Sequence, residues 1–545
     1  MGSPIGGHHM SDRTRSKNCR RGTRAAAALL TAGALAVTAA APAQAGLLGG
    51  LVGGLANVVG GTAGVVTTAL DTTTGLLGGA DWGYAPTVSR LPEVAAAIGA
   101  TSSYAGGYTG KGIGVALIDT GVVPVQGLTS GNVVNGPDLS FDSQSPSPNY
   151  DGFGHGTHMA GIIAGNDGVA GGFTGIAPGA TLLSMRVGAH EGSADVSQVI
   201  AAIDWVVAHR HDPGLNIRVL NLSYGTDGVQ ATTSDPLTHA VENAWRAGIV
   251  VVAAGGNAGS SRPSLDNPAR DPYVIAVGAD DPHGTTSSTL DDTVPAFSSR
   301  GGLTRRVDVV APGQSVASLR DPGSVIDTEY PSAVVDTRFF KGSGTSEAAA
   351  VVSGATALLL QQRPALTPDD VKGLFVETAR VLPLADVAGR GAGLIDLSAA
   401  ARAATPLLAQ SFPHSTGLGS LEGARGSHHV GDNGVDLTGE QDIFGHPWTP
   451  SVWAPLSSAG TAWSGGSWNG ADWAGACWCG TSLASSTWSS RSWSSRSWSS
   501  RSWSDIGWDS RSWSSRSWSG AAWSSRSWSS RSWSGSSWAS AHGHG

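Results

Sequence analysis

Three short motifs carry side chains that could perform nucleophilic and acid–base chemistry: Asp119-Thr120-Gly121, Gly154-His155-Gly156 and Gly344-Thr345-Ser346. A serine hydroxyl becomes a nucleophile when a histidine takes its proton, and a carboxylate that orients the histidine completes such a set. Each motif alone also has a simple structural interpretation, as a capping Asp, a core His or an N-cap Ser. Together they follow the order Asp, His, Ser, which is one of the chain orders in which such triads occur.

Other chemical interpretations of these residues fit the sequence less well. An aspartic peptidase needs two carboxylates that share a proton, and the chain has no second Asp-Thr-Gly. His155 and His158 stand at i and i+3 without a nearby Glu, so they make a poor zinc signature. Ser346 is not in the G-x-S-x-G turn of α/β-hydrolases, because Ala348 takes the place of the last Gly.

The elements that must position these residues alternate between strands and helices from about residue 83 to residue 405. Continuous apolar runs that suit buried parallel strands lie at 113–118, 182–187, 218–222 and 249–253. With a helical period at 196–207, the pattern predicts an α/β domain with helices on both faces of a mainly parallel sheet. Ligand sites on such sheets lie at the carboxyl ends of strands, where Asp119 stands. Ser346 opens the helical run 347–362, whose free N–H groups suit a nucleophile that generates an oxyanion.

The chain from Tyr108 to Leu397 resembles the subtilisin-like (S8) serine peptidases. The motifs that carry the resemblance, in family order, are GYTGKGIGVALIDTGV around Asp119, HGTHMAG from His155, GIAPGA at 175–180, VLNLSYG at 219–225, VVVAAGGN ending at Asn257, FSSRG at 297–301, VDVVAPG at 307–313 and GTSEAAAVVSG from Gly344. The resemblance implies a subtilisin-like three-layer domain with a parallel sheet, and hydrolysis of protein or peptide substrates as a serine endopeptidase.

The resemblance also implies a role for each matching residue. Ser346 would attack the scissile carbonyl, His155 would take its proton and return it to the leaving amine, and Asp119 would orient His155. Asn257 would donate its amide to the oxyanion beside the backbone N–H of Ser346. Ser223, Tyr224 and Gly225 match the strand edge along which an extended peptide pairs.

The sequence departs from the family pattern beside the nucleophile and at the substrate edge. Residue 347 is Glu where the family often has an uncharged residue, and we expect its carboxylate to point aside into solvent. The alternative is that Glu347 shifts the pH optimum or favours basic leaving groups. Tyr224 replaces a smaller residue and would narrow the first specificity pocket. Catalysis of this type requires no cofactor or metal; structural calcium is common in the family, but no Asp or Asn spacing here predicts a specific calcium loop.

The N-terminal region predicts export. Six basic residues between Arg13 and Arg24 precede an apolar run at 25–41 and the small residues Ala43-Gln44-Ala45. This is the layout of a secretory signal peptide over residues 1–45, with tag-like residues upstream of Met10, and it predicts a secreted or cell-surface protein. A membrane anchor is the alternative. The Gly/Leu-rich segment 46–82 is expected to be a spacer.

Composition sets the C-terminal part of the chain apart. The 545 residues carry a net charge of −8, which disfavours a general nucleic-acid binder. Of 20 Trp, 17 stand at or after Trp448, and from 463 to 538 they recur every five residues with one skip. After a linker at 406–456, residues 457–545 therefore form a Trp pentad repeat, either solenoid-like or of low complexity. Its Trp and Arg side chains could contact cell-wall glycan or a polyanion.

Two rival functions use the same sequence features. In the first, the peptidase fold is a binding protein that has lost its activity or cleaves only itself, which the complete set of Asp119, His155, Asn257 and Ser346 argues against. In the second, the repeat is the main function, as an adhesin or surface structure, and the peptidase serves only maturation.

Overall fold

The chain divides into two compact units, Met1–Asp71 and Thr72–Gly545. The computed structural model describes residues 88–143, 147–262, 264–407, 409–432, 435–473 and 488–490, all within the second unit. The predicted signal peptide, the Gly/Leu-rich segment 46–82 and most of the predicted repeat lie outside the described residues. None of the helices in these ranges is long and apolar enough to cross a bilayer.

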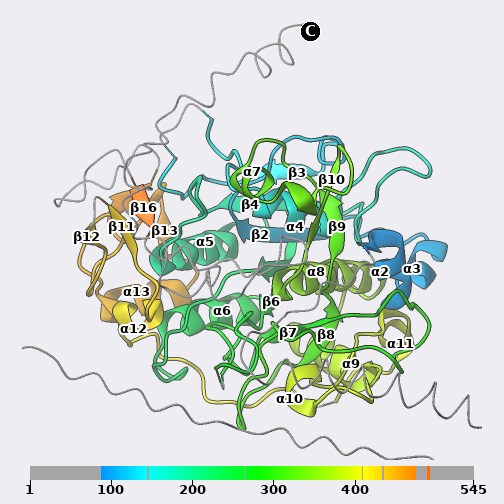
Figure 1. The fold of residues 1–545 in the computed structure, drawn as a ribbon. Helices are drawn as coiled ribbons and strands as arrows, with labels where there is room; N and C mark the ends of the chain where they lie inside the picture. Colours follow the sequence, from blue (N-terminus) through cyan, green and yellow to red (C-terminus); the bar gives the residue numbers. More distant parts are fainter. Residues whose placement is uncertain are drawn as a thin grey trace, which may run out of the picture. The chain divides into compact units, whose positions relative to one another are not determined.

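A seven-stranded sheet, all of whose neighbouring strands are parallel, forms the centre of the described unit in the order β3-β4-β2-β5-β6-β7-β8 (Figure 1). The strands are β2 Gly114–Asp119, β3 Val133–Asn135, β4 Thr181–Arg186, β5 Ile217–Leu222, β6 Val250–Ala254, β7 Ile275–Asp280 and β8 Val309–Pro312. Nearly every residue of the central strands is buried, as expected for a sheet covered on both faces. The predicted α/β fold with a parallel sheet is confirmed.

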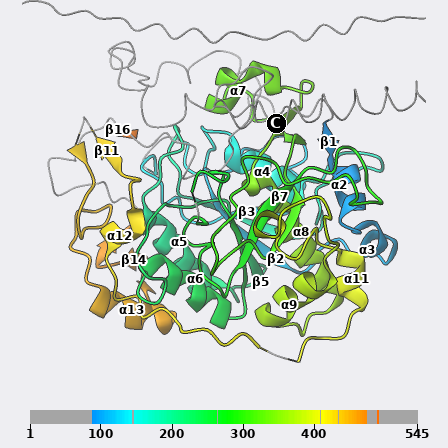
Figure 2. The ribbon, with the colours of Figure 1, turned by 60° about the horizontal axis from the view of Figure 1, so that its bottom comes forward.

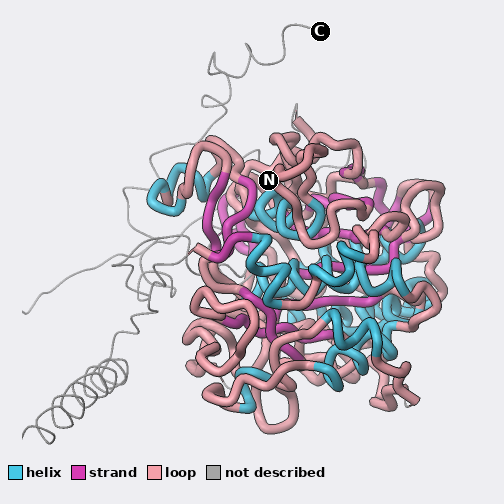
Figure 3. Tube along the Cα trace, turned by 90° about the vertical axis from the view of Figure 1, so that its right-hand side faces the viewer, coloured by secondary structure: helices cyan, strands magenta, loops and turns pink. Residues whose placement is uncertain are grey.

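Two pairs of helices cover the sheet. Helix α4 (His155–Ala164) packs against α8 (Thr345–Gln362), and α5 (Val196–His209) packs against α6 (Pro236–Arg246). Figure 3 shows the strands as magenta tubes among the cyan helices. Helix α8 contacts five strands of the sheet and is buried from Thr345 to Leu360, so the residues at its first turn lie inside the protein.

The remaining elements of the peptidase part surround this core. A small sheet has the order β1-β9-β10, with β1 Ser89–Arg90, β9 Val316–Leu319 and β10 Phe339–Gly342. The further helices are α2 Leu91–Ala97, α3 Thr101–Ala105, α7 Val325–Glu329, the 3₁₀ turn η1 Pro331–Ala333, α9 Pro368–Thr378, α10 Val387–Arg390 and α11 Leu397–Arg402.

Residues 409–432 and 435–473, here called the C-terminal segment, are packed on the peptidase core rather than extended as a linker. Its elements are α12 Leu421–Arg425, β11 Val430–Asp432, β12 Val435–Asp436, α13 Pro450–Ser458, β13 Trp463–Ser464, β14 Ser467–Trp468 and β15 Ala471–Asp472. Helix α12 packs against α5 and α6, α13 against α6, and β13 against α5. Figures 1 and 2 both show this yellow-to-orange segment beside α5 and α6. A short strand β16 (Trp488–Ser490) pairs with β11.

The first Trp pentads fold as very short strands joined by tight turns, and for this reason their sequence shows no helical or strand period. Strands β13, β14 and β15 form an antiparallel meander in which each pentad supplies a two-residue strand and a tight turn. The turns use left-handed backbone at Gly465, Gly466 and Gly470. Trp463 and Trp468 are direct cross-strand partners, so a five-residue spacing brings successive Trp residues side by side.

Candidate active site

The structure brings Asp119 and His155 together at the carboxyl end of the sheet. Asp119 is the last residue of β2, and His155 is the first residue of α4. His155 Nδ1 lies 2.8 Å from Asp119 Oδ1, and both side chains are buried. The contact depends on Gly156, because a Cβ there would lie 2.1 Å from the carbonyl oxygen of Gly121. Gly154, with a φ of 102°, provides the left-handed turn into the helix.

A buried carboxylate that the sequence analysis did not identify holds the start of α4. Asp151 Oδ1 accepts hydrogen bonds from Gly154 N (2.7 Å) and Thr120 Oγ1 (2.8 Å). Its Oδ2 accepts from Thr157 N (2.8 Å) and Thr157 Oγ1 (2.7 Å). Asp151 therefore caps the free N–H groups of the helix that carries His155. Its position four residues before His155 is the signal that a capping analysis of the sequence could have used.

Ser346 stands in the first turn of α8, beside the helix start that carries His155. The two first turns meet, since His158 Nε2 lies 4.0 Å from Glu347 Oε1. On its other side Ser346 contacts Ser223: the hydroxyl of each serine lies near the carbonyl oxygen of the other, at 3.5 Å and 3.4 Å. A nucleophile at this position has the positive end of α8 directly behind it.

Asn257 follows β6 and points its side chain toward the N-terminus of α8. Its Oδ1 accepts hydrogen bonds from Thr345 N (2.9 Å) and Thr345 Oγ1 (3.0 Å). With Oδ1 fixed, the amide Nδ2 is oriented; it is buried and has no hydrogen-bond partner among the described residues. A buried donor without a partner is costly in a resting protein, and here it is available to an oxygen that becomes negative during a reaction.

The charges around His155 set its protonation. Burial alone would lower the pKa of His155, but the charge and hydrogen bond of Asp119, helped by the charges of Glu347 and Asp151, outweigh burial and raise the pKa of His155 above its usual value. Burial, together with the nearby charge of His155, lowers the pKa of His158 to about 3, so His158 is neutral at physiological pH.

The expectation that Glu347 points into solvent is wrong. Its side chain has no exposed surface. The reason is that α8 is covered by the sheet and by α4 around its first turns, so the residue after Ser346 has no path to water. The carboxylate instead faces His158, within the same group of buried ionisable residues as His155.

Ser223, Tyr224 and Gly225 directly follow β5 and run past Ser346. The side chain of Tyr224 is only 1% exposed and lies close enough to Asp195 and Arg425 to feel both charges. Since side chains alternate along an extended chain, Tyr224 faces the protein interior while Ser223 faces Ser346. The Tyr224 ring therefore lies on the interior side of this edge. The sequence had instead predicted that the ring narrows the first specificity pocket.

Asp266 is a second carboxylate near the site, and no sequence motif predicted it. A Cβ at Gly225 would lie 2.7 Å from Asp266 Cβ, and a Cβ at Gly256 would lie 2.5 Å from Asp266 Oδ2. Its side chain thus lies between the ends of β5 and β6, where it forms an ion pair with Arg262. Only the tertiary fold brings residue 266 to these two glycines.

Within the ranges the structure covers, no group of three or more His, Cys, Asp or Glu side chains has the geometry of a metal site.

Known proteins resemble this chain in sequence. A model of the subtilase family matches residues 110–419, more than half of the chain. Serine protease AprX from Bacillus subtilis (strain 168) is 40% identical over 274 residues, which are 49% of this chain and 61% of AprX. Subtilisin DY from Bacillus licheniformis is 37% identical over 298 residues, which are 54% of this chain and 93% of that protein.

A solved structure is also similar, that of a cold adapted subtilisin-like serine proteinase. It is 31% identical, covers 50% of this chain and 84% of its own, and superposes with a TM-score of 0.39. The chain spans less than two thirds of the length of AprX.

Proposed function

This chain belongs to the subtilase family of serine endopeptidases, and from that premise we propose that it hydrolyses peptide bonds through Asp119, His155 and Ser346. The observation that carries the proposal is the 2.8 Å contact between His155 Nδ1 and Asp119 Oδ1 at the helix start that meets the first turn of α8. Peptidases of this family act on protein or peptide substrates and need no cofactor for the hydrolysis itself.

In the proposed acylation step, Ser346 Oγ forms a bond to the scissile carbonyl carbon while His155 Nε2 takes the hydroxyl proton. Asp119 holds His155 in the tautomer with the proton on Nδ1 and stabilises the imidazolium. The C–N bond then breaks, and His155 returns the proton to the leaving amine. In deacylation a water molecule replaces the amine, and the same transfers regenerate Ser346 and release the acid.

Asn257 Nδ2 and the backbone N–H of Ser346 would donate hydrogen bonds to the oxygen that becomes negative in the tetrahedral intermediate. Both donors are fixed before the reaction, Asn257 by its bonds to Thr345 and the backbone N–H by α8. Preorganised donors of this kind stabilise the transition state without reorganisation.

The substrate backbone would pair with the edge Ser223–Gly225, in the manner of an added strand. We further propose that the enzyme acts outside the cell, on the basis of the signal-like residues 1–45. The described Trp residues do not support a glycan contact. Four of those that follow the five-residue spacing are buried: Trp448, Trp453, Trp468 and Trp473.

Labelling with a fluorophosphonate tests the proposed chemistry directly. We expect one equivalent of label, mapped to Ser346 by mass spectrometry, and hydrolysis of a fluorogenic tetrapeptide by the same preparation. The variants Ser346→Ala and His155→Ala should lose labelling, and Ser346→Ala should lose more than about 10⁴-fold in kcat/KM. Thr356→Val is a matched control on the same helix: the buried hydroxyl of Thr356 donates to the carbonyl oxygen of Val352 within α8, and the variant should keep labelling and activity. A folded wild-type protein that is neither labelled nor active would instead support the rival binding-protein function.

A further inference from the structure

The C-terminal segment contacts the chain immediately after the proposed substrate edge. Thr226 Oγ1 donates a hydrogen bond to the carbonyl oxygen of Ala424 at 2.6 Å. Ser427 N and Oγ donate to the two carboxylate oxygens of Asp227 at 2.7 and 2.6 Å. A Cβ at Gly228 would lie 2.6 Å from the carbonyl oxygen of Gly423, so the end of α12 packs directly on residues 226–228.

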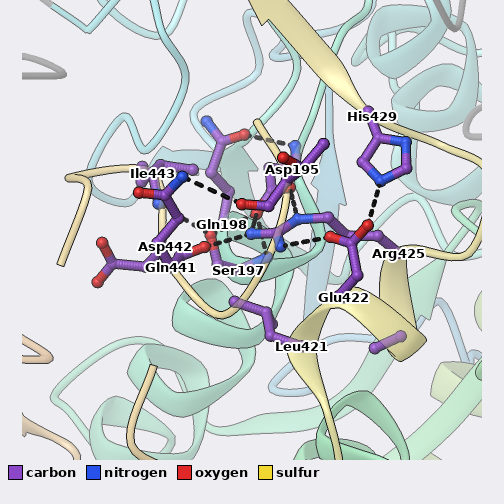
Figure 4. A network of polar contacts seen from close by, with 12 residues as sticks. Asp195, Ser197, Gln198, Leu421, Glu422, Arg425, His429, Gln441, Asp442 and Ile443 are labelled. Carbon is purple, nitrogen blue, oxygen red and sulfur yellow. Dashed lines mark hydrogen bonds and ion pairs between the residues drawn. The ribbon is translucent and has the colours of Figure 1, made fainter. Parts of the chain in front are cut away.

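A buried ion pair fixes α12 in this position (Figure 4). Arg425 Nε lies 2.6 Å from Asp195 Oδ2, and neither side chain has exposed surface. The other guanidinium nitrogens donate to the carbonyl oxygens of Gly439, at 2.6 Å, and Gln441, and to Glu422 at 3.3 Å. A guanidinium held on all sides in this way has a single position, because each of its donors has a specific acceptor.

Asp195 links this ion pair to the core of the peptidase. It is the N-cap residue of α5, where its Oδ1 accepts from Ser197 N at 2.9 Å and from Ser197 Oγ at 2.5 Å. The fully buried side chain of Tyr224, the middle residue of the substrate edge, lies near both Asp195 and Arg425. The edge therefore has the catalytic serine on one side and the ion pair on the other.

The residues just after the edge are also bound to the peptidase core, on the side away from the C-terminal segment. Thr226 N donates to the carbonyl oxygen of Asn267, and Asn267 N donates to that of Thr226, both at 2.9 Å. Residues 224–228 thus lie between Asn267, which belongs to the peptidase core, and Ala424–Ser427, which belong to the C-terminal segment. The contacts from Ala424–Ser427 are therefore a second support for these residues, in addition to the peptidase core.

We propose that the C-terminal segment is a working part of the peptidase, in which Arg425, acting through Asp195 and Tyr224, and Ala424–Ser427, acting through Thr226 and Asp227, are positioning elements for the substrate edge Ser223–Gly225. The inference rests on the proposed function. It predicts that loosening these contacts weakens the binding of extended peptides, because backbone pairing requires the edge to be held within a fraction of an ångström. The chemistry at Ser346 should be unaffected.

The test uses full-length variants and two substrates. Arg425→Lys, Thr226→Val and Ser427→Ala each weaken one contact of the support. Each is assayed with an extended tetrapeptide, which needs the edge, and with a single-residue ester, which does not pair along it. We expect KM for the tetrapeptide to rise about three- to tenfold, the effect of weakening one or two hydrogen bonds to the substrate. Neither kcat nor the KM for the ester should change beyond about twofold.

Gln410→Ala is the control for a purely structural role. Gln410 binds the C-terminal segment to the peptidase core through Tyr273 O (3.0 Å) and Asp369 Oδ1 (2.9 Å), outside the network around Arg425. At an equal loss of stability in urea, the control should keep the wild-type KM. The inference is overturned if the tetrapeptide KM stays constant in Thr226→Val and Ser427→Ala, or if it rises equally in Gln410→Ala. If the wild type shows neither ester hydrolysis nor labelling of Ser346, this result contradicts the proposed function instead.

Discussion

Ionisable groups at the site are buried together, and their charges depend on one another. Asp119, His155 and Glu347 have at most 1% of their surface exposed. A buried charge is tolerated only when it is paired, and Asp119 pairs directly with His155. Glu347 lies 4.0 Å from His158, and its charge also acts on His155 through the low-dielectric interior, where it helps to raise the pKa of His155.

Glu347→Gln should move the acidic limb of the kcat/KM profile to lower pH. Burial lowers the pKa of His155, while Asp119 and, more weakly, Glu347 raise it. Removing the Glu347 charge removes one raising influence, so the pKa of His155 falls and the neutral, basic form persists to lower pH. The profile is measured with one peptide substrate between about pH 4 and about pH 9. An unchanged acidic limb would show that Glu347 does not influence His155.

Asn257→Ala tests the oriented amide. We expect kcat to fall about 10²–10³-fold with little change in KM, which is the loss known for removing one such donor in a subtilisin. The loss belongs to kcat because the donor meets negative charge only in the transition state. Thr345→Val, which removes one of the two bonds that orient Asn257, should lower kcat less. A variant without the amide that keeps kcat within a few fold would remove Asn257 from the mechanism.

At the scale of the element, catalytic geometry depends on how closely α4 approaches the end of β2. Gly156→Ala places a Cβ against the carbonyl oxygen of Gly121, so α4 must move away from the strand that carries Asp119. We expect a fall of about 10²-fold in kcat, as for a shift of about 1 Å in a catalytic group. Gly168→Ala is the control: its Cβ would meet nothing, and only its left-handed backbone is strained. Equal activities of the two variants would contradict this account.

The strands and helices of the core could be predicted from local sequence, because the apolar residues of each one follow the spacing typical of a strand or a helix. The apolar run at 218–222 became β5 (Ile217–Leu222), and the helical period at 196–207 became α5 (Val196–His209). Asp151 could have been found as a cap four residues before His155, but Asp266 could not be predicted, because only the tertiary fold brings it to Gly225 and Gly256. The burial of Glu347 was missed for the same reason: residue 347 is exposed or buried according to what covers α8.

At the scale of the whole described unit, one hydrophobic core extends from the sheet into the C-terminal segment. It includes Leu421, Trp448, Trp453, Trp468 and Trp473 along with the strands. Local periodicity could not predict this, because the segment buries single large rings at five-residue intervals and not a continuous stripe. The predicted boundary at residue 405 therefore marks a change in sequence pattern, while the hydrophobic core continues across it.

The buried carboxylate of Asp204 joins the two parts and yields a pH-dependent prediction. It accepts hydrogen bonds from Trp453 Nε1 (2.8 Å) and Trp468 Nε1 (3.0 Å) and from the hydroxyl of Ser457. Burial raises the pKa of Asp204, while these three bonds, first that of Ser457, oppose the rise. A carboxyl whose pKa is raised by folding favours the folded state when protonated, so its contribution to stability falls as pH rises through the raised pKa.

Trp468→Phe keeps an aromatic ring but removes one donor to Asp204, so the pKa of Asp204 should rise further and ionisation should cost more. We expect the variant to lose about 1–3 kcal/mol of unfolding free energy near pH 7, the cost of an incompletely satisfied buried group, and less near about pH 4, where the carboxyl is increasingly protonated. Urea unfolding at the two pH values measures the difference. Val452→Ala, an exposed position in α13, should change stability by no more than about 0.5 kcal/mol at either pH. A loss in Trp468→Phe that is equal at both pH values would assign the effect to packing of the ring and not to Asp204.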